Sequence, residues 1–166
     1  MNPRNIHPPV RLRAVALVVL ALACLGPAQS PAQIRLRSQQ LSPALQAAVG
    51  QWQVIEEDGK PGGHVETYLI EGRLFGKVTQ SRPERPPDEP CTKCPGELKD
   101  KPVLGMVVIR DFRPEGDRWV GGTVLDPKNG KVYKGKIWTE GDDRLRLRGY
   151  VGIALLGRTE TWARLP

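Results

Sequence analysis

The chain has 166 residues, room for one ordinary domain, with 25 Lys and Arg residues against 18 Asp and Glu residues. Three of the Arg residues precede position 33, so 22 basic residues face 18 acidic ones in the rest of the chain, a net charge of about +4. This modest excess is scattered along the sequence, without clustered basic residues and interleaved aromatic residues. The composition therefore does not predict nucleic-acid binding.

Residues 1–32 are predicted to be a secretory signal peptide. Arg4, Arg11 and Arg13 precede an apolar run from Ala14 to Leu25, and small or helix-breaking residues follow. A run of about 12 apolar residues is shorter than the roughly 20 that a membrane-spanning helix needs. We therefore expect a mature protein without a transmembrane segment, located in the periplasm or outside the cell.

Cys24 leaves a second interpretation of this leader open. The sequence Ala21-Leu22-Ala23-Cys24 resembles a bacterial lipoprotein box, although Ala replaces the usual Leu three residues before the Cys. A lipid anchor on Cys24 is the minor alternative to a cleaved signal peptide.

The next segment, residues 33–49, is predicted to be a polar lead-in followed by a short helix. Ser42 suits the N-cap position, Pro43 the first helical position and Gly50 the position just beyond the end.

Eight short strands are predicted after this helix. The clearest evidence is the segment Asp117–Glu140, where two runs of alternating residues flank the turn residues Asp126-Pro127-Lys128-Asn129-Gly130. The other expected strands span 51–57, 64–70, 73–80, 103–112, 144–150 and 158–164. Glycines interrupt most of them and indicate bends or close approach. Eight antiparallel strands in sequence order close into an up-and-down barrel, so residues 50–166 are predicted to be a single all-β domain.

A membrane-spanning barrel is the competing architecture. Lys134 and Lys136 share one face of the sixth predicted strand, and Arg144, Arg146 and Arg148 share one face of the seventh. If the other face of each of these two strands points inward, their basic residues make the outer surface of the barrel cationic, and that surface cannot face lipid.

The region 81–102 is a Pro-rich loop that contains the motif Cys91-Thr92-Lys93-Cys94. A redox-active pair requires a helix N-terminus beside it, and no helical pattern follows Cys94. We therefore expect a structural disulfide that stabilises the domain by about 2 kcal/mol, because the loop it closes is very short. A thiol–disulfide function remains the less favoured alternative.

Several segments together resemble domain-of-unknown-function family 2147, a family of small exported bacterial proteins. They are GQWQ, EGRLFGKV, CTKCPGELKDKPVLGM, WVGGTVLDPKNGKVYKGKIW and RLRGYVGIALLGRTETW, within residues 50–164. The resemblance implies a lipocalin-like barrel and no established activity. In addition, Gly50-Gln51-Trp52 is similar to the G-x-W signature of lipocalins, in which a basic residue near the last strand covers the Trp. Arg164 lies at the matching place.

Catalytic chemistry gains little support from the sequence. His64 is the only histidine after residue 32, no G-x-S-x-G motif occurs, and zinc requires more ligands than the two cysteines supply. His64, Glu66 and Tyr68 share one strand face, for which a solvated polar surface is the ordinary explanation. We expect no enzyme activity, no metal and no cofactor.

A binding role is the leading hypothesis, because eight-stranded barrels can hold one small ligand. The candidate lining residues are aromatic or charged: Trp52, Tyr133, Tyr150, Arg158, Glu160 and Trp162. The expected ligand is small and largely apolar. Two alternatives stay open: the aromatic residues fill a closed core, or the protein is a cell-envelope interaction module that uses its Pro-rich loop or cationic face.

Overall fold

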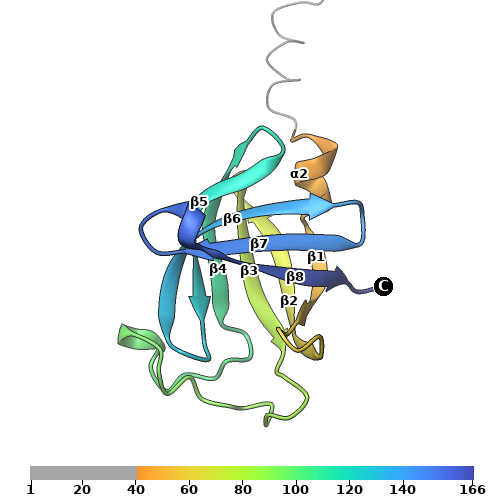
Figure 1. Cartoon of the computed structure of the whole chain (residues 1–166). Helices are drawn as coiled ribbons and strands as arrows, with labels where there is room; N and C mark the ends of the chain where they lie inside the picture. The colour runs from red at the N-terminus through yellow and green to blue at the C-terminus, as the bar shows by residue number, and fades with distance from the viewer. Residues whose placement is uncertain (1–40) are drawn as a thin grey trace, which may run out of the picture. The chain divides into compact units, whose positions relative to one another are not determined.

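The computed structural model describes residues 41–166, and within them each strand pairs antiparallel with its neighbour in sequence. The strands are β1 (Gly50–Ile55), β2 (Pro61–Ile70), β3 (Arg73–Gln80), β4 (Val107–Glu115), β5 (Arg118–Asp126), β6 (Lys131–Glu140), β7 (Arg144–Tyr150) and β8 (Arg158–Arg164). Because β1 also pairs with β8, the sheet closes into a barrel without a free edge (Figure 1). The predicted eight-stranded up-and-down barrel is confirmed. The proposed signal peptide, Cys24 and most of the lead-in lie outside the described residues.

The short helix α2 (Pro43–Ala47) lies at one end of the barrel and begins as the sequence predicts. The hydroxyl of Ser42 accepts a hydrogen bond from the amide of Leu45 at 3.3 Å, and Pro43 occupies the first turn. Leu45 is buried, and its carbonyl oxygen accepts a hydrogen bond from the indole of Trp119 at 3.1 Å. The helix is therefore fixed to β5 by packing and by a buried hydrogen bond.

The alternation of side chains places the core inside the barrel as predicted for β6 and β7. Ile137 pairs with Leu147, and both side chains are buried. Lys136 pairs with Arg148 in the next register position, and these side chains lie on the outer face. The predicted cationic outer face of these strands is confirmed. Within residues 41–166, no helix combines the length and the apolar content needed to cross a bilayer.

The strand β4 differs from its predicted range of 103–112, since it begins at Val107 and continues to Glu115. A bulge accounts for part of the difference. The register against β3 shifts twice, once between Val107 and Ile109, where both Val108 and Ile109 are buried, and once between Ile109 and Phe112, where Asp111 has a φ of 62°. The carboxylate of Asp111 pairs on the surface with Arg73, at 2.6 Å.

The strand β2 also begins earlier than predicted, at Pro61 rather than His64. The turn before it is tighter than expected, because the amide of Glu56 donates to the carbonyl of Lys60 at 2.9 Å. Pro61 therefore already pairs with Ile55 of β1.

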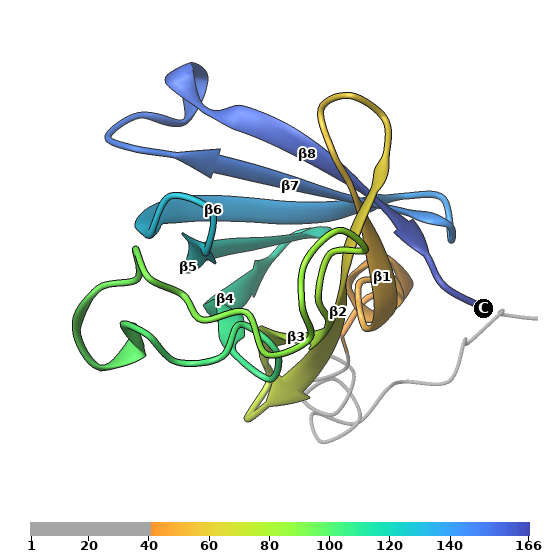
Figure 2. The same cartoon turned by 90° about the horizontal axis from the view of Figure 1, so that it is seen from below.

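Alternating strand directions sort the connections between the two ends of the barrel. The segments 56–60, 81–106, 127–130 and 151–157 meet at one end, which we call the mouth. The turns 71–72, 116–117 and 141–143 lie at the other end together with α2, which we call the closed end. Figure 2 views the barrel from the mouth side and shows the long β3–β4 loop running beside the opening.

The β3–β4 loop is ordered by its own contacts. Cys91 and Cys94 form a disulfide, with a Cα–Cα distance of 5.4 Å, and both residues are buried. The amide of Cys91 donates to the carbonyl of Lys101 at 2.8 Å, and the amide of Val103 donates to that of Glu89 at 2.9 Å. These bonds make a small hairpin-like base that the Pro-rich composition alone does not predict. The short 3₁₀ helix η1 (Gly96–Leu98) follows the disulfide.

Candidate ligand-binding site

A cavity of about 380 Å³ occupies the mouth half of the barrel interior. Its wall is mainly apolar and is contributed by inward-facing residues of several strands: Val54, Val65, Val78, Val108, Val124, Leu147 and Trp162. A cavity of this size falls at the lower end of the range that small-molecule sites occupy. The barrel interior is therefore hollow toward the mouth rather than filled throughout.

The closed end is filled by two buried tryptophans, and this filling limits the cavity. Trp52 and Trp119 both have an exposed fraction of 0%. The indole of Trp52 donates to the carbonyl of Ala48 at 3.2 Å and to the hydroxyl of Thr67 at 3.0 Å. Trp52 is not among the residues that line the cavity, so its position suits a structural plug.

Arg164 covers Trp52 from the outer side of this plug. Its guanidinium carbon lies 4.2 Å from the centre of the Trp52 ring, as the G-x-W resemblance implies. The same side chain donates hydrogen bonds to the carbonyls of Val49 at 3.3 Å, Ala47 and Asp142. Because Ala47 is the last residue of α2, Arg164 satisfies a helix-end carbonyl and ties β8 to the helix.

Charged side chains surround the cavity at the mouth. Arg158 donates to Glu160 at 2.7 Å and to Glu57 at 2.5 Å. The hydrogen bond with Glu160 is the main cause that raises the pKa of Arg158, so this guanidinium stays charged at any physiological pH. The indole of Trp162 also donates to Glu160, at 3.3 Å. The carboxylate of Glu160 thus links the apolar wall to the charged rim.

A second ion pair lies across the mouth, between Glu56 of the β1–β2 connection and Lys128 of the β5–β6 turn. One oxygen of Glu56, Oε2, contacts the ammonium group of Lys128. The other, Oε1, is buried and has no hydrogen-bond partner among residues 41–166. A buried acceptor without a partner is costly in water-excluded surroundings.

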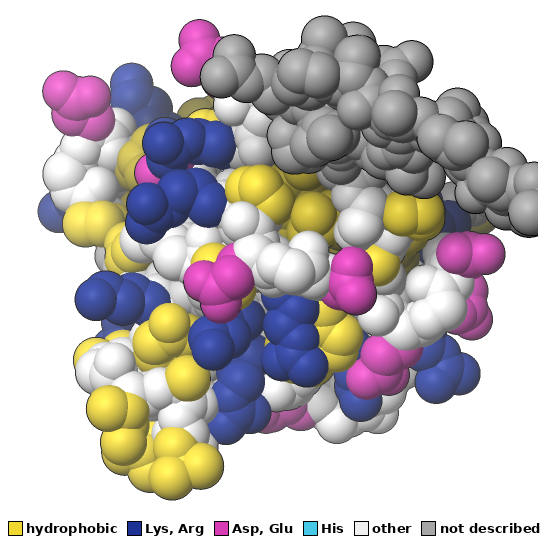
Figure 3. Space-filling view, turned by 90° about the horizontal axis from the view of Figure 1, so that it is seen from above, with side chains coloured by type: hydrophobic (Ala, Val, Ile, Leu, Met, Phe, Trp, Pro, Cys, Tyr) yellow, Lys and Arg dark blue, Asp and Glu magenta, His cyan; other side chains and the backbone are white. Residues whose placement is uncertain are grey.

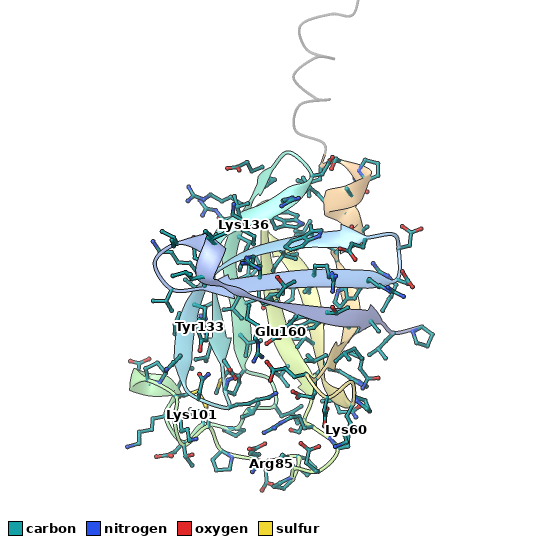
Figure 4. The ribbon with its side chains drawn as sticks, in the orientation of Figure 1. Lys60, Arg85, Lys101, Tyr133, Lys136 and Glu160 are labelled. Atoms are coloured by element: carbon teal, nitrogen blue, oxygen red, sulfur yellow. A yellow bond between two sulfur atoms is a disulfide. The ribbon has the colours of Figure 1, made fainter. Side chains whose placement is uncertain are left out.

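Five of the six candidate lining residues border the cavity, all except Trp52: Tyr133, Tyr150, Arg158, Glu160 and Trp162. Figure 4 labels Tyr133 on β6 and Glu160 on β8, above the loops that carry Arg85 and Lys101. Tyr150 borders the mouth, but it pairs with Lys134, so alternation places its ring on the outer face.

Sequence reasoning missed the rim residues that come from loops. Glu56 could have been found, because it continues the inward alternation of Trp52 and Val54 on β1. Arg82 and Glu89 line the same mouth, yet they belong to the Pro-rich loop, whose path no periodicity reveals.

Of His64, Glu66 and Tyr68, the first lines the cavity at the mouth, and the other two make ordinary cross-strand contacts. Glu66 pairs with Lys77 on β3 at 2.8 Å, and the hydrogen bond from this pairing raises the pKa of Lys77. Tyr68 stacks on Phe75, with ring centres 6.3 Å apart. These are cross-strand contacts between neighbouring strands. The part of the chain that the structure describes holds no cluster of three or more His, Cys, Asp or Glu residues suited to a metal ion.

The two cysteines are also arranged as a structural pair. Their exposed fractions are 1% and 4%, and the Sγ of Cys94 lies 3.8 Å from the Sδ of Met106. Thiol exchange requires access to a sulfur atom and a stabilised thiolate. Neither the burial nor the short 3₁₀ helix that follows favours such a role.

Comparison with known proteins gives a family and a fold. The model of the family described as "Uncharacterized protein conserved in bacteria (DUF2147)" matches residues 50–164. The chain belongs to this family. The DUF2147 barrel is similar to the solved structure titled "Protein HP1028 from the human pathogen Helicobacter pylori belongs to the lipocalin family", with a TM-score of 0.62 and 23% sequence identity.

The likeness to the Helicobacter pylori protein covers 71% of this DUF2147 chain and 82% of that chain. At this identity it shows the lipocalin-like fold alone. No curated protein matches the DUF2147 chain significantly.

Proposed function

We propose that this DUF2147 protein is an exported binding protein that holds one small, largely apolar molecule in its barrel. The observation that carries the proposal is the cavity, which combines an apolar wall with a charged rim at a single mouth. Burial of an apolar ligand against this wall supplies the affinity, at roughly 25 cal/mol for each Å² removed from water. The polar rim fixes which end of the ligand faces out.

The charges at the mouth favour a neutral ligand with a hydrogen-bond donor. Among the residues that line the cavity, three are basic and four are acidic: Arg82, Lys128 and Arg158 against Glu56, Glu89, Asp126 and Glu160. Glu57 adds a further carboxylate beside Arg158. The rim thus has no surplus positive charge for a carboxylate ligand, whereas its carboxylates can accept hydrogen bonds from a hydroxyl or amine.

A binding role suits the charged groups better than catalysis does. Glu56 is paired with Lys128, and Arg158 is held between Glu57 and Glu160. These pairings hold the side chains in place around the opening, which suits a role in shaping the mouth and orienting a ligand.

Export is supported by the disulfide and by the family. Disulfides persist in oxidising compartments such as the periplasm, and the DUF2147 family is bacterial. We propose a periplasmic or secreted location, reached through the leader predicted in residues 1–32.

A pair of related fluorescent probes tests the cavity. N-phenyl-1-naphthylamine is neutral and has one N–H donor, and 1-anilinonaphthalene-8-sulfonate carries an additional sulfonate. We expect the neutral probe to bind with enhanced fluorescence and the anionic probe to bind more weakly.

The matched variant is Gly149→Leu, because Gly149 lines the cavity and an added Cβ would meet its nearest neighbour, Tyr133, at an ordinary 3.5 Å. The leucine should occupy part of the cavity and lower probe affinity at least tenfold, with an unchanged thermal transition. Equal binding by the native protein and Gly149→Leu would place the probe elsewhere and contradict the proposal. If the probe binds in the cavity, mass spectrometry of small molecules extracted from the protein purified from its native cell envelope would identify the natural ligand.

A further inference from the structure

The β7–β8 loop exposes four large apolar side chains in a row of six residues. The exposed fractions are 71% for Val151, 60% for Ile153, 81% for Leu155 and 79% for Leu156. Figure 3 shows apolar side chains gathered on a projection at the lower left, where this loop extends from the barrel. A contiguous apolar projection of this kind indicates a contact surface rather than the scattered exposure common to all proteins.

The loop is held in this shape by β7. The guanidinium of Arg148 donates to the carbonyls of Ala154 at 2.8 Å and Leu155 at 3.0 Å, and to the hydroxyl of Thr159 at 2.9 Å. The 3₁₀ helix η2 (Ala154–Leu156) forms the tip. The leucines are therefore presented outward by a hydrogen-bonded loop and do not fold back into the core.

Basic side chains flank the apolar tip on the outer face of the same strands. Lys134 pairs with Tyr150 at the base of the loop, and Lys136 pairs with Arg148. Within residues 41–166, neither lysine forms an ion pair with an acidic residue, whereas Arg146 is paired with Glu140 at 3.1 Å. The loop itself, residues 151–157, contains no carboxylate. Figure 3 shows a band of Lys and Arg side chains beside the apolar projection.

We propose that the β7–β8 loop docks the barrel on an anionic phospholipid surface. An apolar tip that enters the acyl boundary, with lysines beside it that meet anionic headgroups, is the combination that peripheral membrane binding requires. Val151 and Leu156 also border the cavity, so docking turns the mouth of the barrel toward the bilayer. This inference goes beyond ligand binding and stands whether or not the cavity holds an apolar molecule.

A local fluorescence readout tests the docking in the full chain. The variant Leu155→Trp places an indole on the loop, and the control Ile70→Trp places one at the closed end, where Ile70 is 48% exposed. Three of the four native tryptophans are buried, so they give little response to lipid. Both variants are mixed with vesicles of phosphatidylglycerol and phosphatidylcholine in equal parts, and with vesicles of phosphatidylcholine alone.

The expected result is a blue shift and quenching by brominated lipid for Leu155→Trp with the anionic vesicles, with a smaller effect on neutral vesicles and none for Ile70→Trp. Leu155→Ser combined with Leu156→Ser should lower partitioning by about tenfold or more, since these are the two most exposed apolar side chains of the loop. An unchanged Leu155→Trp spectrum would overturn the proposal, even if another part of the chain binds vesicles. A concentration-dependent dimer that the double serine variant abolishes, seen by sedimentation, would assign the loop to self-association instead.

Discussion

The carbonyl oxygen of Lys93 lies 1.7 Å from the position that a Cβ atom on Gly130 would occupy. The Pro-rich loop and the β5–β6 turn are therefore in direct backbone contact. The Sγ of Cys91, 3.5 Å from the carbonyl oxygen of Pro127, extends the same contact. The turn at the end of the central hairpin thus supports the loop beside the mouth.

We predict that Gly130→Ala destabilises the protein more than Gly72→Ala does. Both glycines have a φ of +74°, but nothing lies within 4 Å of a Cβ on Gly72. Gly72→Ala should cost only the conformational strain, about 1 kcal/mol. Gly130→Ala adds the clash with Lys93 and should cost at least about 2 kcal/mol more. Urea unfolding of the two variants measures the difference, and equal losses would show that the loop moves aside freely.

Removal of the Arg164 side chain should loosen the closed end. Arg164→Ala loses the contact with the Trp52 ring and the hydrogen bonds to Ala47 and Asp142, a loss of about 2–4 kcal/mol. The control is Arg118→Ala, whose guanidinium carbon lies 5.1 Å from the centre of the half-buried Trp138 ring, and it should cost about 0.5–1 kcal/mol. Chemical denaturation compares them. A small effect of Arg164→Ala, matching the control, would argue against a structural role for the plug.

The inside and outside of β6 predict opposite responses to truncation. Ile137 is fully buried, so Ile137→Ala should lower the free energy of unfolding by about 2–4 kcal/mol. Lys134→Ala and Lys136→Ala, on the outer face, should each change it by less than about 0.5 kcal/mol. Urea melts of the three variants give the comparison directly. A large loss from either lysine change would reveal a contact on the outer face that burial does not show.

Loss of the disulfide should mainly increase local opening of the β3–β4 loop. The double variant Cys91→Ser, Cys94→Ser should lower global stability by only about 2 kcal/mol, because the closed ring is short. Trypsin cleavage after Lys93 and Lys99, the basic residues of this loop that no proline follows, should accelerate, while amide exchange in β6 and β7 stays slow. Uniformly faster exchange would mean that the disulfide supports the entire barrel.

The barrel could be predicted from the sequence because its signals are local. Alternation and turn residues define the tight hairpins, as between Asp117 and Glu140, and eight consecutive antiparallel strands have one simple closed arrangement. The irregular course of β4 could not be predicted, since the positive φ occurs at Asp111 and not at a glycine or asparagine that would indicate it. The glycines of β5 and β6 predicted close approach, but only the fold shows that the ring of Phe112 lies against both Gly122 and Gly135.

The candidate site was predictable only where strands line it. Tyr133, Arg158 and Trp162 belong to regular strands, so alternation could place them. The ion pair of Glu56 with Lys128 joins two loops separated by 72 positions in sequence, and no pattern relates them. The apolar loop at 151–156 was visible as a sequence, yet its exposure depends on how Arg148 holds it away from the core.

The pairing of Trp52 with Arg164 has a consequence for how the protein folds. The strands from β1 to β7 can pair in order as each is synthesised. The β1–β8 pairing, the seam that closes the barrel, needs the first and last strands together. Joining ends this far apart has a high entropic cost and slows folding. Until β8 arrives, the edges of β1 and β7 stay unpaired and open to other chains. We expect the closing of this seam to be the slow folding step and the interval of greatest exposure to aggregation.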